Sequence, residues 1–172
     1  MVAVRTLIVV ESIFGNTEAI GRAIATGIGG DVEVLGTDAA PDRIPDDIDL
    51  VVVGGPTHAF AMSTPATRKS AREQGAEHIP TRGIREWLDG LATPTQPPRV
   101  ATFDTRTVSP RLPGSAAKKA IKHLVRRGMQ PIAKPETFGV HGYSGPLADG
   151  ETARAERWGR ELARSMSRSS AG

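Results

Sequence analysis

The first residues with a clear chemical use form a short loop of hydroxyl, glycine and amide residues between an apolar run and a helical pattern. The loop consists of Ser12, Ile13, Phe14, Gly15, Asn16 and Thr17. Hydroxyl groups, a permissive glycine and the free N–H groups of a helix N-terminus together favour an anion, and a monophosphate fits them well. The loop has no lysine and no G-x-G-x-x-G pattern, which argues against a Walker A motif or a pyrophosphate-binding turn. The competing interpretation is an ordinary capped strand-to-helix turn.

Apolar runs alternate with helical patterns along the whole chain. Continuous aliphatic and β-branched runs predict buried strands, and apolar residues at helical spacing predict helices. The expected strands are 6–10, 31–35, 49–53, 100–103 and 137–140. A first helix is expected after the loop 12–17, a second is capped by Ser63 or Thr64, and a third is capped by Thr81. A fourth covers 115–127, and the last carries an apolar stripe of Ala155, Trp158, Leu162 and Met166.

Nearly apolar strands that alternate with helices predict a parallel sheet covered on both faces. We expect a doubly wound α/β fold in one domain, 1–172, with five parallel strands in the order 2-1-3-4-5 and a frayed tail at 167–172. In such sheets ligands bind outside the carboxyl ends of the strands, where the order reverses between the first and third strands. The loop 12–17 lies at this point, on a helix N-terminus that solvent can reach.

Composition excludes several classes of chemistry. The chain of 172 residues contains no cysteine, so disulfides, thiolate nucleophiles and cysteine-bound metal clusters are absent. The four histidines lack metal-ligand spacing, and no metal site is predicted. The longest apolar run near the N-terminus, 7–10, is too short for a signal peptide or a membrane span. These features predict a cytoplasmic protein without membrane insertion.

The net charge of +3 hides two oppositely charged segments. Residues 31–55 carry seven acids and one arginine, which gives −6, and residues 99–134 carry nine cations and one acid, which gives +8. A basic segment of this kind is a solvated helix face, a surface for an acidic partner or an anionic ligand, or a nucleic-acid surface. No helix-turn-helix, zinc finger or aromatic RNA-binding pattern supports the last of these, so no nucleic-acid partner is predicted.

Four motifs in order resemble the flavodoxin family and cover nearly the whole chain. The loop 12–17 is similar to its phosphate loop, Gly54-Gly55-Pro56-Thr57-His58 to its second flavin loop, and Asp104-Thr105-Arg106 falls where its third flavin loop would be. The segment 145–151, followed by Arg154 and Trp158, is similar to the entry to the last helix of many bacterial members. The absence of a long insertion around the fifth strand indicates a short-chain member.

The resemblance implies FMN as the cofactor and three loops that hold it. The implied contacts are Ser12, Ile13, Phe14, Gly15, Asn16 and Thr17, then Pro56, Thr57, His58, Ala59 and Phe60, then Asp104, Thr105 and Arg106. His58 and Phe60 would edge or cover the flavin ring, or pack on their own neighbours. Arg106 would lie near the ring, or else point to solvent or pair with Asp104.

Three features depart from the family pattern. Phe14 stands where many members have a threonine that contacts phosphate. The third loop, 104–113, contains no tyrosine or tryptophan to stack on the flavin. The sequence pI is about 9.7, whereas carrier flavodoxins are typically acidic around the flavin. These departures leave the redox tuning and the partner open.

The pattern as a whole predicts an FMN-binding electron carrier between a reductase and an acceptor. The expected partner is an acidic redox protein that docks near Lys119, Lys122 and Arg126, which share one face of the helix at 115–127. One alternative is an FMN-dependent NAD(P)H:quinone-type oxidoreductase, and another is a flavin-free interaction module. A response regulator is excluded because the third strand ends in Gly54-Gly55 without a phospho-acceptor, and an α/β hydrolase because G-x-S-x-G is missing.

Overall fold

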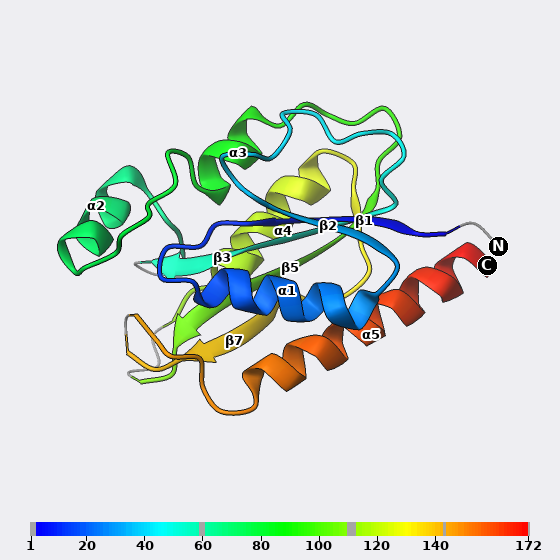
Figure 1. Ribbon diagram of the computed structural model, residues 1–172. Helices are drawn as coiled ribbons and strands as arrows, with labels where there is room; N and C mark the ends of the chain where they lie inside the picture. Colours follow the sequence, from blue (N-terminus) through cyan, green and yellow to red (C-terminus); the bar gives the residue numbers. More distant parts are fainter. Residues whose placement is uncertain (1–2, 59–60, 110–112, 143, 172) are drawn as a thin grey trace.

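Three layers build the molecule, with a twisted parallel sheet between two groups of helices (Figure 1). The computed structural model describes residues 3–58, 61–109, 113–142 and 144–171. Its strands are β1 (Arg5–Val10), β2 (Asp31–Gly36), β3 (Leu50–His58), β4 (Ala61–Met62), β5 (Arg99–Thr107), β6 (Gln130–Pro131) and β7 (Glu136–Val140). Its helices are α1 (Asn16–Ile28), α2 (Pro65–Glu73), α3 (Ile84–Gly90), α4 (Ala116–Arg126) and α5 (Glu151–Ala171). Within these ranges, no helix is long and apolar enough to cross a membrane.

The strand order confirms the predicted doubly wound topology. Parallel pairing runs β2-β1-β3-β5, and two short strands, β6 and β7, both pair with β5 on its other side. β6 pairs with Arg99 and Val100 at the start of β5, whereas β7 pairs with 103–107 at its end. The fifth position of the 2-1-3-4-5 order is therefore filled by two pieces of chain separated at 132–135, a break that the sequence did not predict.

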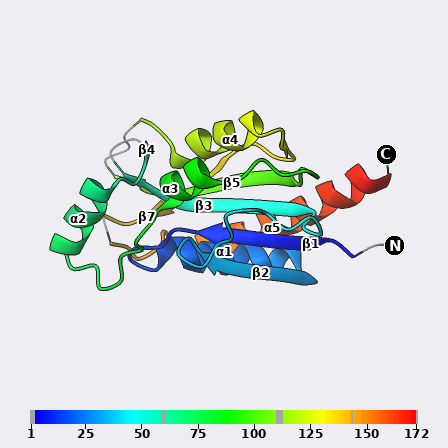
Figure 2. The same cartoon turned by 90° about the horizontal axis from the view of Figure 1, so that it is seen from above.

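Each face of the sheet has its own apolar core, because neighbouring strand residues point to opposite faces. Val51 and Val53 pack with α3 and α4, whereas Val52 packs with α1 and α5. Trp87 lies in the first of these cores and Trp158 in the second, as the position of Trp158 on an apolar stripe predicted. Figure 2 shows α1 and α5 on one face and α3 and α4 on the other, with α2 beyond the carboxyl ends of the strands.

A close crossing of α1 and α5 uses two glycines. A Cβ atom at Gly27 would lie 2.0 Å from the carbonyl oxygen of Glu156, and one at Gly159 would lie 2.3 Å from that of Ile24. Gly27 lies inside α1, next to its last residue, and allows the two backbones to approach.

Several element boundaries differ from those that the sequence predicted. β3 and β5 extend to His58 and Thr107, because they stay paired with each other as far as Pro56 and Thr105. Beyond that point β3 forms a hairpin with β4, and β5 pairs with β7. α3 begins after Gly83, since the Thr81 backbone N–H donates to Asp38 Oδ2 and Thr81 therefore belongs to a loop contact. α5 continues through Ala171, across the segment where a frayed tail was expected.

Candidate functional site

The loop between β1 and α1 presents the N-terminus of α1 at the carboxyl edge of the sheet. Gly15 is the N-cap residue and has a φ of 91°, a left-handed conformation that glycine adopts without strain. The Ser12 hydroxyl accepts a hydrogen bond of 3.2 Å from the Glu18 backbone N–H in the first turn. Its own proton therefore remains available to donate to a ligand.

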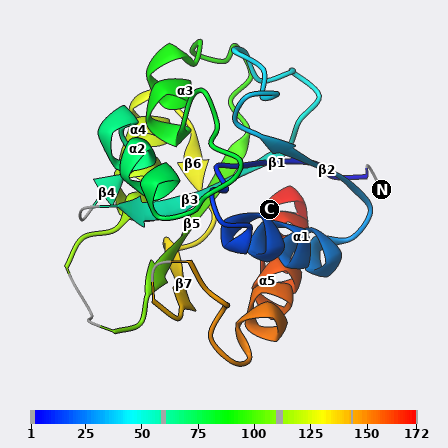
Figure 3. The ribbon, with the colours of Figure 1, turned by 60° about the vertical axis from the view of Figure 1, so that its left-hand side comes forward.

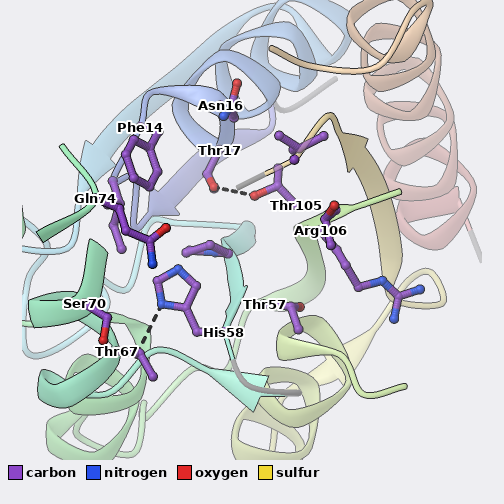
Figure 4. A pocket seen from close by; sticks show the side chains of 15 residues that line it. Phe14, Asn16, Thr17, Thr57, His58, Thr67, Ser70, Gln74, Thr105 and Arg106 are labelled. Carbon is purple, nitrogen blue, oxygen red and sulfur yellow. Dashed lines mark hydrogen bonds between the residues drawn. The ribbon is translucent and has the colours of Figure 1, made fainter. Parts of the chain in front are cut away.

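A cavity of about 410 Å³ lies beside this loop at the ends of β1, β3 and β5 (Figure 4). Nine of the predicted site residues line it: Ile13, Phe14, Asn16, Thr17, Pro56, Thr57, His58, Thr105 and Arg106. The structure thus brings together residues of all three predicted loops. Ser12, Gly15 and Asp104 do not line the cavity, and Ala59 and Phe60 lie outside the described residues.

The first and third predicted loops are joined by a buried hydrogen bond. The hydroxyl oxygens of Thr17 and Thr105 are 2.8 Å apart, and both side chains are almost fully buried (Figure 4). Either hydroxyl can donate, so one proton of the pair can be directed into the cavity. The sequence placed Thr17 on a helix end that solvent reaches, whereas the close approach of β5 covers it.

Asp104 supports α4 instead of facing the cavity. Its Oδ2 accepts hydrogen bonds from the Ser115 hydroxyl, the Ala117 backbone N–H and the Thr57 hydroxyl. Thr57 in turn accepts from the Ala116 backbone N–H at 3.0 Å. Asp104 thus holds the N-terminus of α4 against the ends of β3 and β5, and its contact with a ligand stays a prediction.

His58 forms part of the cavity wall as a neutral imidazole. Its Nδ1 is 3.2 Å from the Thr67 hydroxyl on α2 (Figure 4). Burial, assisted by the nearby Arg68 guanidinium, lowers the pKa of His58 to about 4. At neutral pH the ring is therefore uncharged, with Nδ1 bound to Thr67 and an apolar face along the cavity wall.

Phe14 supplies an aromatic ring where the family pattern has a hydroxyl. Its side chain packs on a small apolar cluster formed by Ile13, Ala71 and Ala76, which ties the first loop to α2. The ring also lines the cavity, as Figure 4 shows. Phe14 therefore lacks the hydroxyl group of the family pattern, and its ring adds an apolar wall to the cavity.

Arg106 lines the cavity, but its guanidinium is directed away from it. Nη1 donates to the carbonyl of Gly114 at 2.6 Å, and Figure 4 shows the side chain extending away from His58 and Thr17. The arginine thus ties the end of β5 to the segment before α4, a contact that the sequence did not predict.

One wall of the cavity comes from α2, which sequence reasoning did not include. Thr67, Ser70 and Gln74 lie at helical spacing and line the cavity with uncharged hydrogen-bonding groups. Thr64 caps this helix with its side chain, as expected. The i, i+3, i+7 spacing of the three polar residues was a usable signal, but only the fold shows that the helix lies over the strand ends.

The loop after β7 closes the remaining side of the cavity. Val140 and Gly142 line it, and Asn16 Nδ2 donates to the Ser144 carbonyl at 3.0 Å. A Cβ atom on Gly145 would lie 2.8 Å from the Asn16 side-chain amide, so the glycine allows this contact. Asn16 therefore ties the first loop to the loop before α5.

Solved structures with the same arrangement of strands and helices are flavodoxins and related flavoproteins. A flavodoxin from the domain Archaea has a TM-score of 0.63 at 19% sequence identity, over 95% of this chain and 99% of that chain. Oxidised flavodoxin 1 from Bacillus cereus has a TM-score of 0.68 at 17% identity, over 93% and 97%. The chain has a flavodoxin-like fold. The metal-soaked flavodiiron core from Synechocystis is similar over 97% of this chain and 37% of that chain, with a TM-score of 0.61 at 17% identity. No protein-family model matches the sequence, and neither does any curated protein.

A buried network of polar side chains holds the first loop of this flavodoxin-like chain in place. Glu11, next to Ser12, accepts from the Ser63 hydroxyl and from the Ile84 backbone N–H at 2.8 Å. Arg68 donates to Ser63 and forms an ion pair of 2.7 Å with Glu86. Burial raises the pKa of the Glu11 carboxyl, an effect partly offset by its hydrogen bonds and by the Arg68 charge. The network joins β1 to α2 and α3, so it fixes both sides of the cavity.

The charge of the cavity wall favours an anionic ligand. None of the described lining residues is an aspartate or glutamate, and the N-terminus of α1 contributes the positive end of its dipole. Within the described ranges, no group of three or more histidine, aspartate or glutamate side chains is arranged to hold a metal ion. The cavity is thus suited to an organic anion with an extended polar and apolar body.

Proposed function

We propose that the protein binds FMN and acts as an electron carrier between a reductase and an acceptor. The observation that carries the proposal is the cavity outside the carboxyl ends of β1, β3 and β5, whose described lining contains no carboxylate and which has the N-terminus of α1 at one end. Doubly wound folds bind their ligands at this place, and flavodoxin itself is a standard example, with FMN at the point where the strand order reverses. The cavity volume of about 410 Å³ falls in the range of small-molecule sites.

The chain's own groups fit the two ends of FMN. In the proposal, the phosphate lies at the loop 12–17, where the Ser12 and Thr17 hydroxyls and the first backbone N–H groups of α1 donate to it. The ring lies between Phe14 and His58 on one side and Thr57 and the backbone of β5 on the other. Ala59 and Phe60 of the second loop remain proposed contacts. When bound, FMN supplies one- and two-electron chemistry, and the protein orients it and limits access of water.

A second candidate, an FMN-dependent oxidoreductase with a substrate of its own, is favoured by the polar wall of α2. Thr67, Ser70 and Gln74 offer hydrogen bonds to a small substrate beside the ring, which a pure carrier does not need. Turnover of NAD(P)H with a quinone, followed by absorbance without added reductase, separates the two candidates. Rapid turnover supports the oxidoreductase, and its absence supports the carrier.

The first prediction compares FMN with riboflavin. FMN should bind far more tightly, because each charge-assisted hydrogen bond lost with the phosphate costs about 1–3 kcal/mol. Titration of both flavins into the purified protein, followed by quenching of flavin fluorescence, measures the difference. Equal affinities would rule out a phosphate site at the loop 12–17.

A pair of glycine variants tests the site at the same helix. Gly15→Ala strains the backbone at the proposed phosphate site, and Gly29→Ala strains it at least as much at the other end of α1. Both glycines have positive φ and open space around a Cβ, and Gly29, with a ψ of 179°, lies in a region that essentially only glycine adopts. We expect Gly15→Ala to weaken FMN about tenfold or more and Gly29→Ala to leave the affinity unchanged. A loss of thermal stability in Gly29→Ala at least as large as that in Gly15→Ala would show that the weaker FMN binding of Gly15→Ala does not come from lower stability alone.

A further inference from the structure

A second, apolar groove lies on the outer edge of the sheet, between the later turns of α4 and the segment that separates β6 from β7. Its volume is about 550 Å³. The apolar lining residues are Ile121, Val125, Pro131, Ala133 and Pro135, and the cations around them are Lys122, Arg126 and Lys134. Figure 3 shows β6 beside α4, in agreement with their tertiary contacts. The break in the fifth strand at 132–135 forms one wall of this groove.

The charges around the groove have one sign. Lys122 and Arg126 come from successive turns of α4, and Lys134 comes from the opposite wall. In the described part of the chain, none of the three forms an ion pair, and no carboxylate lines the groove. Val125 is 48% exposed, although its side chain is apolar. The groove therefore combines an uncovered apolar floor with positive charge on both sides.

A partner cannot occupy this edge of the sheet by pairing its backbone with the outermost strands. β6 and β7 are the outermost strands of the sheet on this side, and an exposed edge can add a further strand. Pro131 and Pro135 have no backbone N–H and interrupt the row of donors along it. An occupant must therefore be held by side-chain burial and by charge.

The groove is remote from the cavity proposed for FMN. It lies where β6 pairs with Arg99 and Val100, whereas the cavity lies at Thr105 and Arg106 on the same strand. Six strand residues correspond to about 20 Å. A partner that fills the groove can therefore leave the cavity accessible.

We propose that this groove docks a partner protein through an acidic segment with one or two large apolar side chains. The apolar side chains bury Val125 and Ile121, and flanking carboxylates meet the cations on both walls. Charge complementarity selects this occupant, since a neutral apolar segment would leave three cations partly desolvated without partners. The inference goes beyond FMN binding and does not depend on it.

A labelled synthetic peptide tests the proposal on the full-length protein. The peptide has leucine and phenylalanine flanked by glutamates on both sides. Two control peptides replace the glutamates with glutamines or the apolar residues with alanines. Binding is followed by fluorescence anisotropy at low ionic strength. We expect the first peptide to bind at least about tenfold more tightly than either control, because charge and apolar burial contribute together.

Matched charge reversals on α4 locate the binding site. Lys122→Glu with Arg126→Glu changes the groove, and Lys118→Glu with Lys119→Glu makes the same change of net charge on exposed residues outside it. All four positions lie on the solvent side of one helix, so both double variants should fold, which the unfolding midpoints check. The first pair should abolish peptide binding, and the second should weaken it less than about threefold.

The other outcomes each contradict the proposal. Equal loss in both double variants would mean that only the overall charge attracts the peptide. Equal binding of the acidic peptide and its alanine control would mean that the apolar floor is not used. Tighter binding of a single-stranded oligonucleotide than of the peptide, lost in the same groove variants, would assign the surface to nucleic acid.

Discussion

His58 lines the cavity, and its surroundings determine whether its imidazole is charged at neutral pH. Its imidazole is buried against Thr67 and near the Arg68 guanidinium, and its pKa is lowered to about 4. The second prediction is that its NMR signals, assigned with a His58→Gln variant, titrate near pH 4 and stay constant from about pH 5.5 to 8. Titration near the ordinary value of 6.5 would show that the side chain is solvated.

The same shift makes stability depend on pH in a definite direction. Between pH 4 and 6.5 the unfolded chain binds a proton at His58 that the folded chain does not, so stability falls as the pH falls through this window. The contribution is at most about 3 kcal/mol, since 1 pKa unit corresponds to about 1.4 kcal/mol. Denaturant unfolding of the wild type and of His58→Gln at several pH values measures it, and the variant should show a flatter dependence in this window.

Strand alternation explains which residues of the third loop could be predicted to face the cavity. The sequence predicted that β5 ends at Phe103, which made Asp104, Thr105 and Arg106 equivalent loop residues. The strand instead continues to Thr107, so alternate residues face opposite sides of the sheet. Asp104 faces α4, whereas Thr105 faces Thr17 on α1. Residue types alone locate the cluster, but the length of the strand decides the direction of each side chain.

At the scale of elements, the cavity depends on how α2 and α3 are held against β1. Arg68 is 4% exposed and links Ser63 with Glu86, and Ser63 donates to Glu11. Removal of one member of a buried ionic network leaves the opposite charge unpaired, at a cost of about 3–5 kcal/mol. The third prediction is that Arg68→Met lowers the free energy of unfolding by this amount at neutral pH and disturbs FMN binding through the loop beside Glu11.

The pH dependence of that loss reports on Glu11 and on His58, because the Arg68 charge lowers the pKa of both groups. Burial already raises the pKa of Glu11, and removal of the Arg68 charge raises it further. Protonation of Glu11 at lower pH then removes the buried charge, so the difference between Arg68→Met and wild type should shrink as the pH falls. Arg85→Met is the control, because Arg85 donates to the backbone carbonyls of Met62 and Ser63, which do not titrate. The Arg85 charge also lowers the pKa of His123, so its effect should change with pH only through that side chain. Equal behaviour of the two variants would contradict the role given to Glu11.

The elements that the sequence predicted are those with strong local patterns. The apolar runs of β1 and β3, the stripe of α4 and the Thr64 cap of α2 were all identified. The β3–β4 hairpin and the break between β6 and β7 were not, because two-residue strands have no periodicity to detect. The position of α2 over the strand ends is likewise set by tertiary contacts such as that of Phe14 with Ala71. The position of α2 provides one wall of the cavity, and the break between β6 and β7 provides one wall of the groove.

At the scale of the whole molecule, opposite charges lie at opposite edges of the sheet. The acidic segment 31–55 includes β2, which is the outermost strand on one side, and the basic segment 99–134 includes α4 and β6 on the other. The N-terminus of α4 lies directly under the cavity, since the Ala116 backbone N–H donates to Thr57. The basic edge therefore extends from the cavity to the groove. Charges at the cavity end should affect the reaction of the bound flavin, and charges at the groove end should affect the binding of a partner.

The last prediction uses ionic strength to separate these two ends. Lys118→Glu with Lys119→Glu and Lys122→Glu with Arg126→Glu each change the net charge from +3 to −1, but the second pair lies up to about 12 Å further along α4 from the cavity. The Debye length is about 30 Å at 0.01 M salt, about 10 Å at 0.1 M and about 3 Å at 1 M. Reduction of the FMN-loaded proteins by dithionite, an anionic reductant, is followed by stopped-flow absorbance. Both double variants should slow the reduction at 0.01 M salt, mainly the Lys118 and Lys119 pair should slow it at 0.1 M, and neither should slow it at 1 M. A larger effect of the Lys122 and Arg126 pair at 0.1 M would place the reacting edge of the flavin near the groove and contradict the assignment of the cavity.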